Sequence, residues 1–297
     1  MTKMKGVRWR YARKLRRKAR LNSKLLIRAF AEVPREHYLG AGPWQLVTSK
    51  GYRSSRTAHP RALYDDILVG IVHERWLNNG QPSGLAGWLD ALELGRNDTV
   101  VHIGCGTGYY TAILAHVTGP RGRVRAIEID RELVPRAKEN LRHLPNVEVV
   151  EGDGSKIDPG PADAIFVNAG ANFPILAWLD ALNPGGRLLF PLITTQLATI
   201  PMLRHGGRIT GSYRFRMGGV MVLVRRENSK FSARAISSVG IFPCIGAIER
   251  NADRNVAKAI ERGGVQGIRS IRRDAHEPAA SCWLHTNGVC VSTAPLD

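Results

Sequence analysis

The feature that most constrains the fold is a strand that enters a glycine-rich turn and continues into a helix. Residues 99–103 read Thr-Val-Val-His-Ile, an apolar and mostly β-branched run that is typical of a buried parallel strand. Gly104, Gly106 and Gly108 follow at alternate positions, and a helical segment over 109–117 comes next. Glycines permit a sharp turn and close contact between backbone and ligand, and the first amides of the helix point at that ligand. The pattern predicts an α/β fold with a ligand site at the end of this strand.

Strand ends further along the chain narrow the choice of ligand. Residues 123–128 read as a second strand ending in Glu128, 20 residues past Gly108, where an acid can accept both hydroxyls of a ribose. A third strand over 147–151 leads into a Gly-Asp-Gly turn at 152–154. The glycine turn itself reads G-C-G-T-G-Y and lacks the G-x-G-x-x-G spacing of dinucleotide-binding folds. A doubly wound domain that binds NAD, or that binds no nucleotide, is the alternative.

Two further strands complete the order. Residues 162–168 form a fourth strand ending in Asn168, and an Asn-Pro-Gly-Gly turn leads into a fifth strand over 183–191. This order resembles the class I S-adenosylmethionine (SAM) methyltransferases. The resemblance implies an α/β, Rossmann-like, doubly wound sheet closed by an antiparallel strand pair, with SAM as the cofactor. The residues that it assigns to SAM are Gly104, Cys105, Gly106, Thr107, Gly108, Glu128, Ile129, Asp153, Gly154 and Asn168.

Motifs in the first third of the chain indicate a family within this class. Val-Pro-Arg-Glu stands at 33–36, a Tyr-x-Asp motif stands at 64–66, and Gln81-Pro82 opens a helix 23 residues before Gly104. Taken with the later motifs, the chain resembles the protein-L-isoaspartate O-methyltransferase family over about residues 30–225. The resemblance implies an enzyme that transfers a methyl group from SAM to a carboxyl group on a protein or peptide.

Two positions depart from the family pattern. Gly80 stands where the family has the serine of its acceptor site, and His102 stands where it has an acid two residues before the first glycine. We expect the loop over 78–83 to line the acceptor pocket, so the candidate catalytic residues are Asn79, Gln81 and Ser83. An acceptor of another kind, such as a small molecule or a different peptide side chain, therefore stays open.

The chemistry of a carboxyl acceptor explains why no catalytic triad is visible. A carboxyl group has an ordinary pKa of about 4 and is already ionised at pH 7, so it needs no general base. The enzyme has to align the acceptor with the methyl group and exclude water. An amine or hydroxyl acceptor would more often need a base, for which His59 and His73 are the nearest candidates. The sequence favours ordinary loop positions for both histidines.

The N-terminus concentrates positive charge. The chain has 43 basic and 25 acidic residues, a net charge of +18, and residues 1–28 contain twelve Lys or Arg and no acid. One helix is predicted over 7–31, within a basic N-terminal segment of 1–32. It either contacts nucleic acid through residues 1–20, as in a nucleic-acid-associated methyltransferase, or forms a solvated helix whose second half packs on the enzyme. Residues 1–20 are so polar that we expect them to add little to the core.

A C-terminal α+β extension over 229–297 follows the predicted methyltransferase domain of 33–228. It contains a predicted strand over 233–242, a helix over 253–262 and two apolar runs that can pair. Additions of this kind often carry specificity. The extension is therefore either a cap over the acceptor or an oligomer contact, and the sequence leaves the oligomeric state open.

The cysteine positions bear on metal binding, and the hydropathy of the chain bears on its cellular location. The cysteines are Cys105, Cys244, Cys282 and Cys290, and none forms a Cys-x-x-Cys pair, so the sequence predicts no metal site and reduced thiols. Cys282 and Cys290 would face each other if the last apolar run folds as a hairpin. The sequence has no run of about 18 apolar residues, and its basic start lacks an apolar core segment. We therefore expect a cytoplasmic enzyme without a membrane span.

Overall fold

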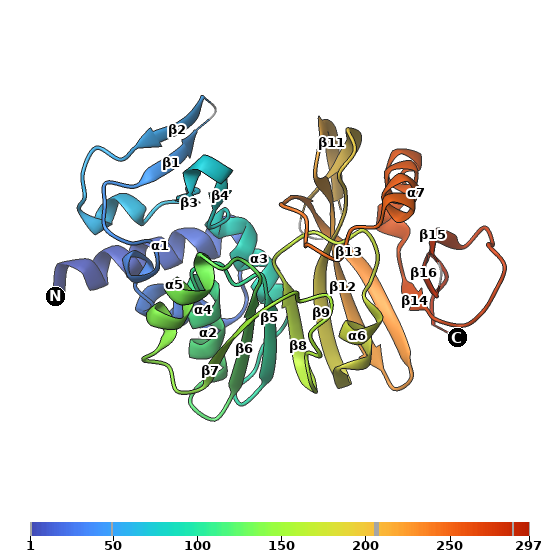
Figure 1. Ribbon diagram of the computed structural model, residues 1–297, viewed down its shortest axis with the longest axis horizontal. Helices are drawn as coiled ribbons and strands as arrows, with labels where there is room; N and C mark the ends of the chain where they lie inside the picture. Colours follow the sequence, from blue (N-terminus) through green and yellow to red (C-terminus); the bar gives the residue numbers. More distant parts are fainter. Residues whose placement is uncertain (1, 49, 205–207, 287, 297) are drawn as a thin grey trace. The chain divides into compact units, whose positions relative to one another are not determined.

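The computed structural model describes residues 2–48, 50–204, 208–286 and 288–296 (Figure 1). The chain divides into two compact units. Unit 1 comprises Met1–Asp98 and Cys105–Glu151, and unit 2 comprises Thr99–Gly104 and Gly152–Asp297. The chain therefore passes from unit 2 to unit 1 within the glycine-rich turn.

Unit 1 begins with two helices where the sequence analysis predicted one. Helix α1 spans Thr2–Ala19 and helix α2 spans Lys24–Glu32. The break has two local causes. Arg20 adopts a left-handed backbone with φ 55°, which no α-helix continues, and the Ser23 hydroxyl accepts a hydrogen bond from the Leu26 amide at 3.1 Å, which caps α2.

Helix α1 packs into unit 1, so the expectation that residues 1–20 add little to the core is wrong. It contacts α2 and helix α3 (Pro82–Ala91). Its buried positions follow one helical stripe, and they are Val7, Tyr11, Ala12, Leu15 and Ala19. Basic residues stand between these positions, so the average composition of residues 1–20 is polar although one side of the helix is apolar. Three of the basic side chains pair with acids of unit 1, in the pairs Arg8–Glu36, Lys14–Asp65 and Lys18–Asp66.

The remainder of unit 1 alternates helices with short strands. Two antiparallel pairs, β1–β2 and β3–β4, lie in a stretch for which the sequence analysis predicted no strand. Strands β6 and β7 run parallel, with Glu128 opposite Glu151. The bounds are η1 Arg35–Tyr38, β1 Gln45–Thr48, β2 Gly51–Ser54, η2 Pro60–Leu63, β3 Gly70–Val72, η3 His73–Arg75, β4 Leu77–Asn78, α4 Tyr109–Thr118, β6 Arg123–Glu128, α5 Leu133–Leu141 and β7 Val147–Glu151.

Unit 2 is built on one mixed sheet with the strand order β15-β16-β14-β13-β12-β9-β8-β5 (Figure 1). Strands β5, β8 and β9 run parallel, and antiparallel pairing begins at β12. The predicted closing strand pair is thus β12 with β13. The bounds are β5 Thr99–Ile103, β8 Ala162–Val167, α6 Leu176–Asp180, β9 Leu182–Thr194, β10 Ala198–Arg204, β11 Arg208–Phe215, β12 Gly218–Glu227, β13 Lys230–Gly240, α7 Arg250–Arg262, η4 Val265–Gly267, β14 Ser270–Arg272, β15 Cys282–Thr286 and β16 Val289–Ser292.

The C-terminal extension continues this sheet. Strand β13 and helix α7 confirm the strand and helix predicted there, and each begins three residues earlier than predicted. Strand β14 pairs with β16, which confirms that the two apolar runs can pair, and β15 pairs with β16 in a hairpin. The hairpin register places Cys282 opposite Ser292 and Cys290 opposite His285. Within the described parts of the chain, no helix is both long enough and apolar enough to cross a membrane.

Candidate functional site

The glycine-rich turn in unit 1 is fixed by backbone bonds at both ends. The Cys105 amide donates to the Ile127 carbonyl at 3.3 Å, and the Gly108 amide donates to the Cys105 carbonyl at 3.0 Å. Gly108 has φ 93°, and a Cβ there would lie 2.7 Å from a methyl carbon of Leu141. Backbone conformation and packing therefore both require glycine immediately before α4. Asn140 adds a side-chain bond to the carbonyl of Thr107 at 2.9 Å.

Glu128, at the end of β6, is bound to this turn through its carboxylate. One oxygen accepts from the Gly106 amide at 2.6 Å, and the other accepts from the amides of Ile129 and Asp130 at 3.0 Å each. The residue is 7% exposed, and burial raises its pKa above the ordinary value although these three bonds oppose the rise. A carboxylate offers about four acceptor positions, so about one remains for a ligand hydroxyl. Burial beside this acid also raises the pKa of the Cys105 thiol, which keeps the thiol neutral.

In unit 2, the predicted SAM residues lie at strand ends. The Asn168 amide donates to the Ile103 carbonyl at 2.8 Å, which continues the pairing of β8 with β5. The Asp153 carboxylate accepts from the amide and the hydroxyl of Ser155 at 2.9 and 2.7 Å. Burial would raise the pKa of Asp153, but the bonds from Ser155 and the nearby Lys156 outweigh burial and lower it. Asp153 is therefore ionised at neutral pH. The carbonyl of Gly154 accepts from the Trp178 indole at 2.8 Å.

A strap from the C-terminal extension lies against the same strand end, which sequence reasoning did not anticipate. We define the strap as residues 242–249. Gly170 donates to the Phe242 carbonyl at 2.8 Å and accepts from the Cys244 amide at 2.7 Å. The side chain of Asn172 bonds both the carbonyl and the amide of Glu249, at 2.7 and 3.1 Å. The strap therefore borders the carboxyl end of β8, where open α/β folds bind ligands.

His102 is a core residue of unit 2. It is fully buried and stacks on Phe166 with ring centroids 5.1 Å apart. Burial lowers its pKa to about 3, so the ring stays uncharged at neutral pH. These surroundings suit a packing role better than a catalytic one.

Asp66 of the Tyr-x-Asp motif organises the predicted acceptor loop in unit 1. Its carboxylate accepts from the Ser83 amide and hydroxyl, both at 2.8 Å, and from the Gln81 side chain at 3.1 Å. It also pairs with Lys18 of α1. Burial would raise the pKa of Asp66, but the bonds from Lys18, Ser83 and Gln81 outweigh burial and lower it. Asp66 thereby caps α3 in place of Gln81, whose side chain forms no cap bond.

Asn79 and Arg35 form a second buried junction under this loop. The Asn79 carbonyl oxygen accepts from the Val69 amide at 3.1 Å and from the Arg35 guanidinium at 3.2 Å. Arg35 also bonds the main-chain carbonyl of Ile67 at 2.8 Å. The amide nitrogen of Asn79 is buried and has no hydrogen-bond partner among the described residues. The Val-Pro-Arg-Glu motif therefore supplies the arginine that holds the acceptor loop, a role the sequence analysis did not assign.

Gly80 has a structural reason to be glycine. Its φ is +73°, and a Cβ built there would lie 2.7 Å from a methyl carbon of Leu85. Its amide donates to the Asn78 side chain at 3.0 Å, and this bond holds the backbone in that conformation. A serine at this position would therefore be strained. The alternative bases, His59 and His73, interact with residues close to them in the sequence. The His59 ring accepts a hydrogen bond from the Arg61 amide, and the His73 ring pairs with Glu74.

Comparison with known proteins decides the family. The model of the protein-L-isoaspartate(D-aspartate) O-methyltransferase family matches residues 10–210, about two thirds of the chain. The chain belongs to this family. The resemblance inferred from the sequence motifs is thereby confirmed, and the match includes α1 from Arg10 onward.

Individual relatives agree with this assignment. The chain is 32% identical over 201 residues to the protein-L-isoaspartate O-methyltransferase of Aeropyrum pernix, a match that covers 66% of this chain and 70% of the relative. It is 32% identical over 173 residues to the enzyme of Thermotoga maritima, covering 56% of this chain and 50% of the relative. The chain spans about half the length of several of the curated relatives that it matches.

Solved structures support the fold class. A protein-L-isoaspartate O-methyltransferase aligns with TM-score 0.59 at 24% identity, over 86% of this chain and 68% of that chain. A putative member of the family from Plasmodium falciparum, in complex with S-adenosyl-L-homocysteine, aligns with TM-score 0.57 at 17% identity, over 80% of this chain and 97% of that chain. The α/β class I methyltransferase fold is confirmed.

Proposed function

We propose that this protein is a SAM-dependent methyltransferase that methylates a carboxyl group on a protein or peptide. Family membership supports the reaction class. The observation that carries the proposal is the Glu128 carboxylate at the end of β6, bound to the amide of Gly106 in the glycine-rich turn. This arrangement fits a nucleoside because it leaves about one acceptor position on a buried acid for a ribose hydroxyl.

The other SAM residues enter the proposal from their positions in the motif order. The glycine-rich turn over 104–108 and Ile129 accompany Glu128, and Asp153, Gly154 and Asn168 stand at the ends of later strands. We propose Asp153 as the acceptor for the adenine amine, because its carboxylate is ionised and the bonds from Ser155 use one oxygen, while the other pairs at 3.4 Å with Lys156, whose side chain is exposed. SAM would supply an electrophilic methyl group on a positively charged sulfur.

The acceptor loop would bind the incoming carboxylate through neutral donors. The buried amide nitrogen of Asn79 is a donor with no partner in the described structure, and an entering carboxylate would satisfy it. The Ser83 hydroxyl is already donated to Asp66, so we assign Ser83 and Gln81 to positioning the loop. No general base is needed, since the acceptor oxygen attacks as an ionised carboxylate.

The test is methyl transfer from tritiated SAM to an isoaspartyl peptide and to its normal-aspartyl twin. The expected product is a base-labile methyl ester formed on the isoaspartyl peptide. Glu128→Gln should reduce SAM affinity in calorimetry, while Glu148→Gln, an exposed acid at mid-strand in β7, should not. Equal SAM affinity in the wild type and Glu128→Gln would remove Glu128 from the site.

A changed acceptor is the second candidate, and two observations favour it. Gly80 carries no hydroxyl, and the Ser83 hydroxyl that lies closest in sequence is occupied by Asp66. The strap over 242–249 also borders the carboxyl end of β8 and lies outside the residues that the family model matches. Base-labile label on other acidic peptides, with none on the isoaspartyl peptide, would identify this second function.

A further inference from the structure

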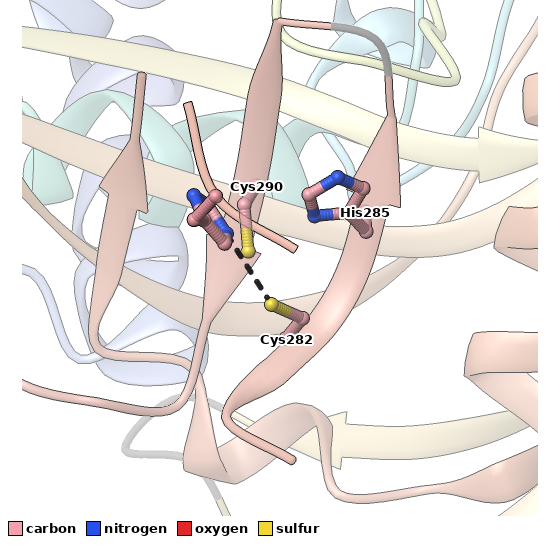
Figure 2. Close-up of side chains that lie close together, drawn as sticks. Cys282, His285 and Cys290 are labelled. Atoms are coloured by element: carbon pink, nitrogen blue, oxygen red, sulfur yellow. Dashed lines mark hydrogen bonds between the residues drawn. The ribbon is translucent and has the colours of Figure 1, made fainter. Parts of the chain in front are cut away.

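Four side chains in the last part of the extension converge on one point. They are His276, Cys282, His285 and Cys290, and one nitrogen or sulfur from each lies within 4.8 Å of the atoms of all the others. Cys282 and His285 belong to β15, and Cys290 belongs to β16. Figure 2 shows the side chains of Cys282, His285 and Cys290 pointing toward one another between the strands. The hairpin register places Cys290 directly opposite His285.

The distances suit tetrahedral coordination by two sulfurs and two nitrogens. Bond lengths of about 2.3 Å to sulfur and about 2.0 Å to nitrogen put neighbouring ligand atoms roughly 3.3–3.8 Å apart around the metal. The Cys282 sulfur lies 3.4 Å from Nε2 of His276, within this range. The two histidine rings meet edge to face with centroids 4.9 Å apart, and one nitrogen of each lies within 4.8 Å of the other ligand atoms.

The surroundings orient the ligand atoms for a metal. Nδ1 of His276 lies 2.8 Å from the main-chain carbonyl of Asp274, a contact that places the proton on Nδ1 and leaves Nε2 free to coordinate. The Ala279 amide donates to the Cys282 sulfur at 3.3 Å, which stabilises a thiolate. Nδ1 of His285 is buried and has no hydrogen-bond partner among the described residues. A buried nitrogen of this kind calls for a ligand.

We propose that His276, Cys282, His285 and Cys290 bind one zinc ion. Two thiolates and two neutral imidazoles form the donor set that zinc prefers at tetrahedral sites, and two thiolate charges balance the charge of the ion. With four protein ligands the site has no open position, so its role is structural. The absence of a Cys-x-x-Cys pair concealed it, because the spacing is His-x5-Cys-x2-His-x4-Cys and the cysteines come from opposite strands.

The ion would hold the end of the extension together. Residues 273–281 form the connection between β14 and β15, and a metal would tie that connection to the β15–β16 hairpin through His276. Trp283, adjacent to Cys282, donates to the Gly263 carbonyl at the end of α7 at 2.8 Å. Zinc at Cys282 would thereby stabilise the contact between β15 and α7.

The experiment measures metal in the full-length protein purified under reducing conditions without chelators. Elemental analysis should find about one zinc per chain. Cobalt added to chelator-treated protein should give the visible absorption of tetrahedral Co²⁺ together with a thiolate charge-transfer band. Cys282→Ser and Cys290→Ser should each lose both signals. Cys244→Ser, a buried cysteine elsewhere in unit 2, should keep them.

A second measurement uses the wild-type chain, so its result does not depend on whether the cysteine variants fold. Titration with a thiol-reactive mercurial should release zinc stoichiometrically, as detected by a colorimetric chelator, and should lower the melting temperature. Zinc below about a tenth of an equivalent, with no cobalt spectrum, would overturn the proposal. A Cys282–Cys290 disulfide in the freshly purified protein, found by non-reducing peptide mapping, would overturn it as well.

Discussion

Asp66→Ala tests how strongly one buried carboxylate controls the acceptor loop. The Asp66 side chain is 3% exposed and accepts from the Ser83 amide, the Ser83 hydroxyl, the Gln81 side chain and Lys18. Losing the cap of α3 costs about 1 kcal/mol. Leaving the half-buried Ser83 hydroxyl without its acceptor adds about 1 kcal/mol. The pair with Lys18, which is half exposed, contributes at most about 1 kcal/mol. The sum predicts a loss of about 2–3 kcal/mol in the free energy of unfolding.

The assay is denaturant unfolding of the wild type, Asp66→Ala and Asp65→Ala. Asp65 is the matched control, because it pairs with Lys14 of the same helix but its side chain is 56% exposed. We expect a loss below about 1 kcal/mol for that variant. In methyl-transfer assays, Asp66→Ala should raise KM for the peptide and leave SAM affinity unchanged. Equal destabilisation of the two variants would refute the reasoning.

The pH dependence gives an independent check on Asp66. Its pKa in the folded state lies below the ordinary value, so the folded protein binds this proton less readily than the unfolded chain does. The stabilisation from Asp66 is therefore complete above the unfolded pKa of about 4 and is lost as the pH falls through the folded pKa. The wild type and Asp66→Ala should converge in stability toward low pH. A constant difference across that range would contradict the assignment.

The remaining predictions concern the N-terminal helix, the cofactor acid and the acceptor glycine. Leu15→Ala should cost about 2–5 kcal/mol in denaturant unfolding, because Leu15 is fully buried in α1, and deleting residues 1–20 should lower the melting temperature by several degrees. Glu128→Ala should weaken SAM binding by about 1–3 kcal/mol in calorimetry. In the wild type, SAM binding should weaken on acidification at a higher pH than an ordinary glutamate would give, because the pKa of Glu128 is raised. Gly80→Ser should destabilise the protein without raising isoaspartyl methylation above the wild-type level, and Gly80→Ala should show the same strain without the hydroxyl.

The methyltransferase core was predictable because its pattern is local. Short stretches of sequence are enough to recognise it, through their apolar periodicity and their glycines. These stretches contain the strand before Gly104, the acid at Glu128 and the strands that follow in order. Most of strand β13 was predictable for the same reason. The break between α1 and α2 was not predictable, because an arginine does not indicate the left-handed backbone that Arg20 adopts.

The contacts that organise the sites depend on distant partners, and this is why the sequence did not reveal them. Asp66 stands 17 residues before Ser83, and Arg35 reaches Asn79 across 44 residues. The sequence predicted that Gly80 replaces the serine of the family pattern, but it did not reveal that the Ser83 hydroxyl donates to Asp66. The histidine–cysteine cluster likewise depends on a hairpin register that spacing alone does not specify.

Gly246 limits how the C-terminal extension can change during evolution or design. A Cβ on Gly246 would lie 2.4 Å from the carboxylate of Asp153 and 2.3 Å from the hydroxyl of Ser155, and the backbone there has φ +85°. The strap and the acid that we propose for adenine thus share one close contact within unit 2. An extension grafted from another enzyme would need a glycine at the same position against Asp153, because a side chain there would displace Asp153. The extension is therefore not an interchangeable module, and grafting a new one should alter cofactor affinity together with acceptor choice.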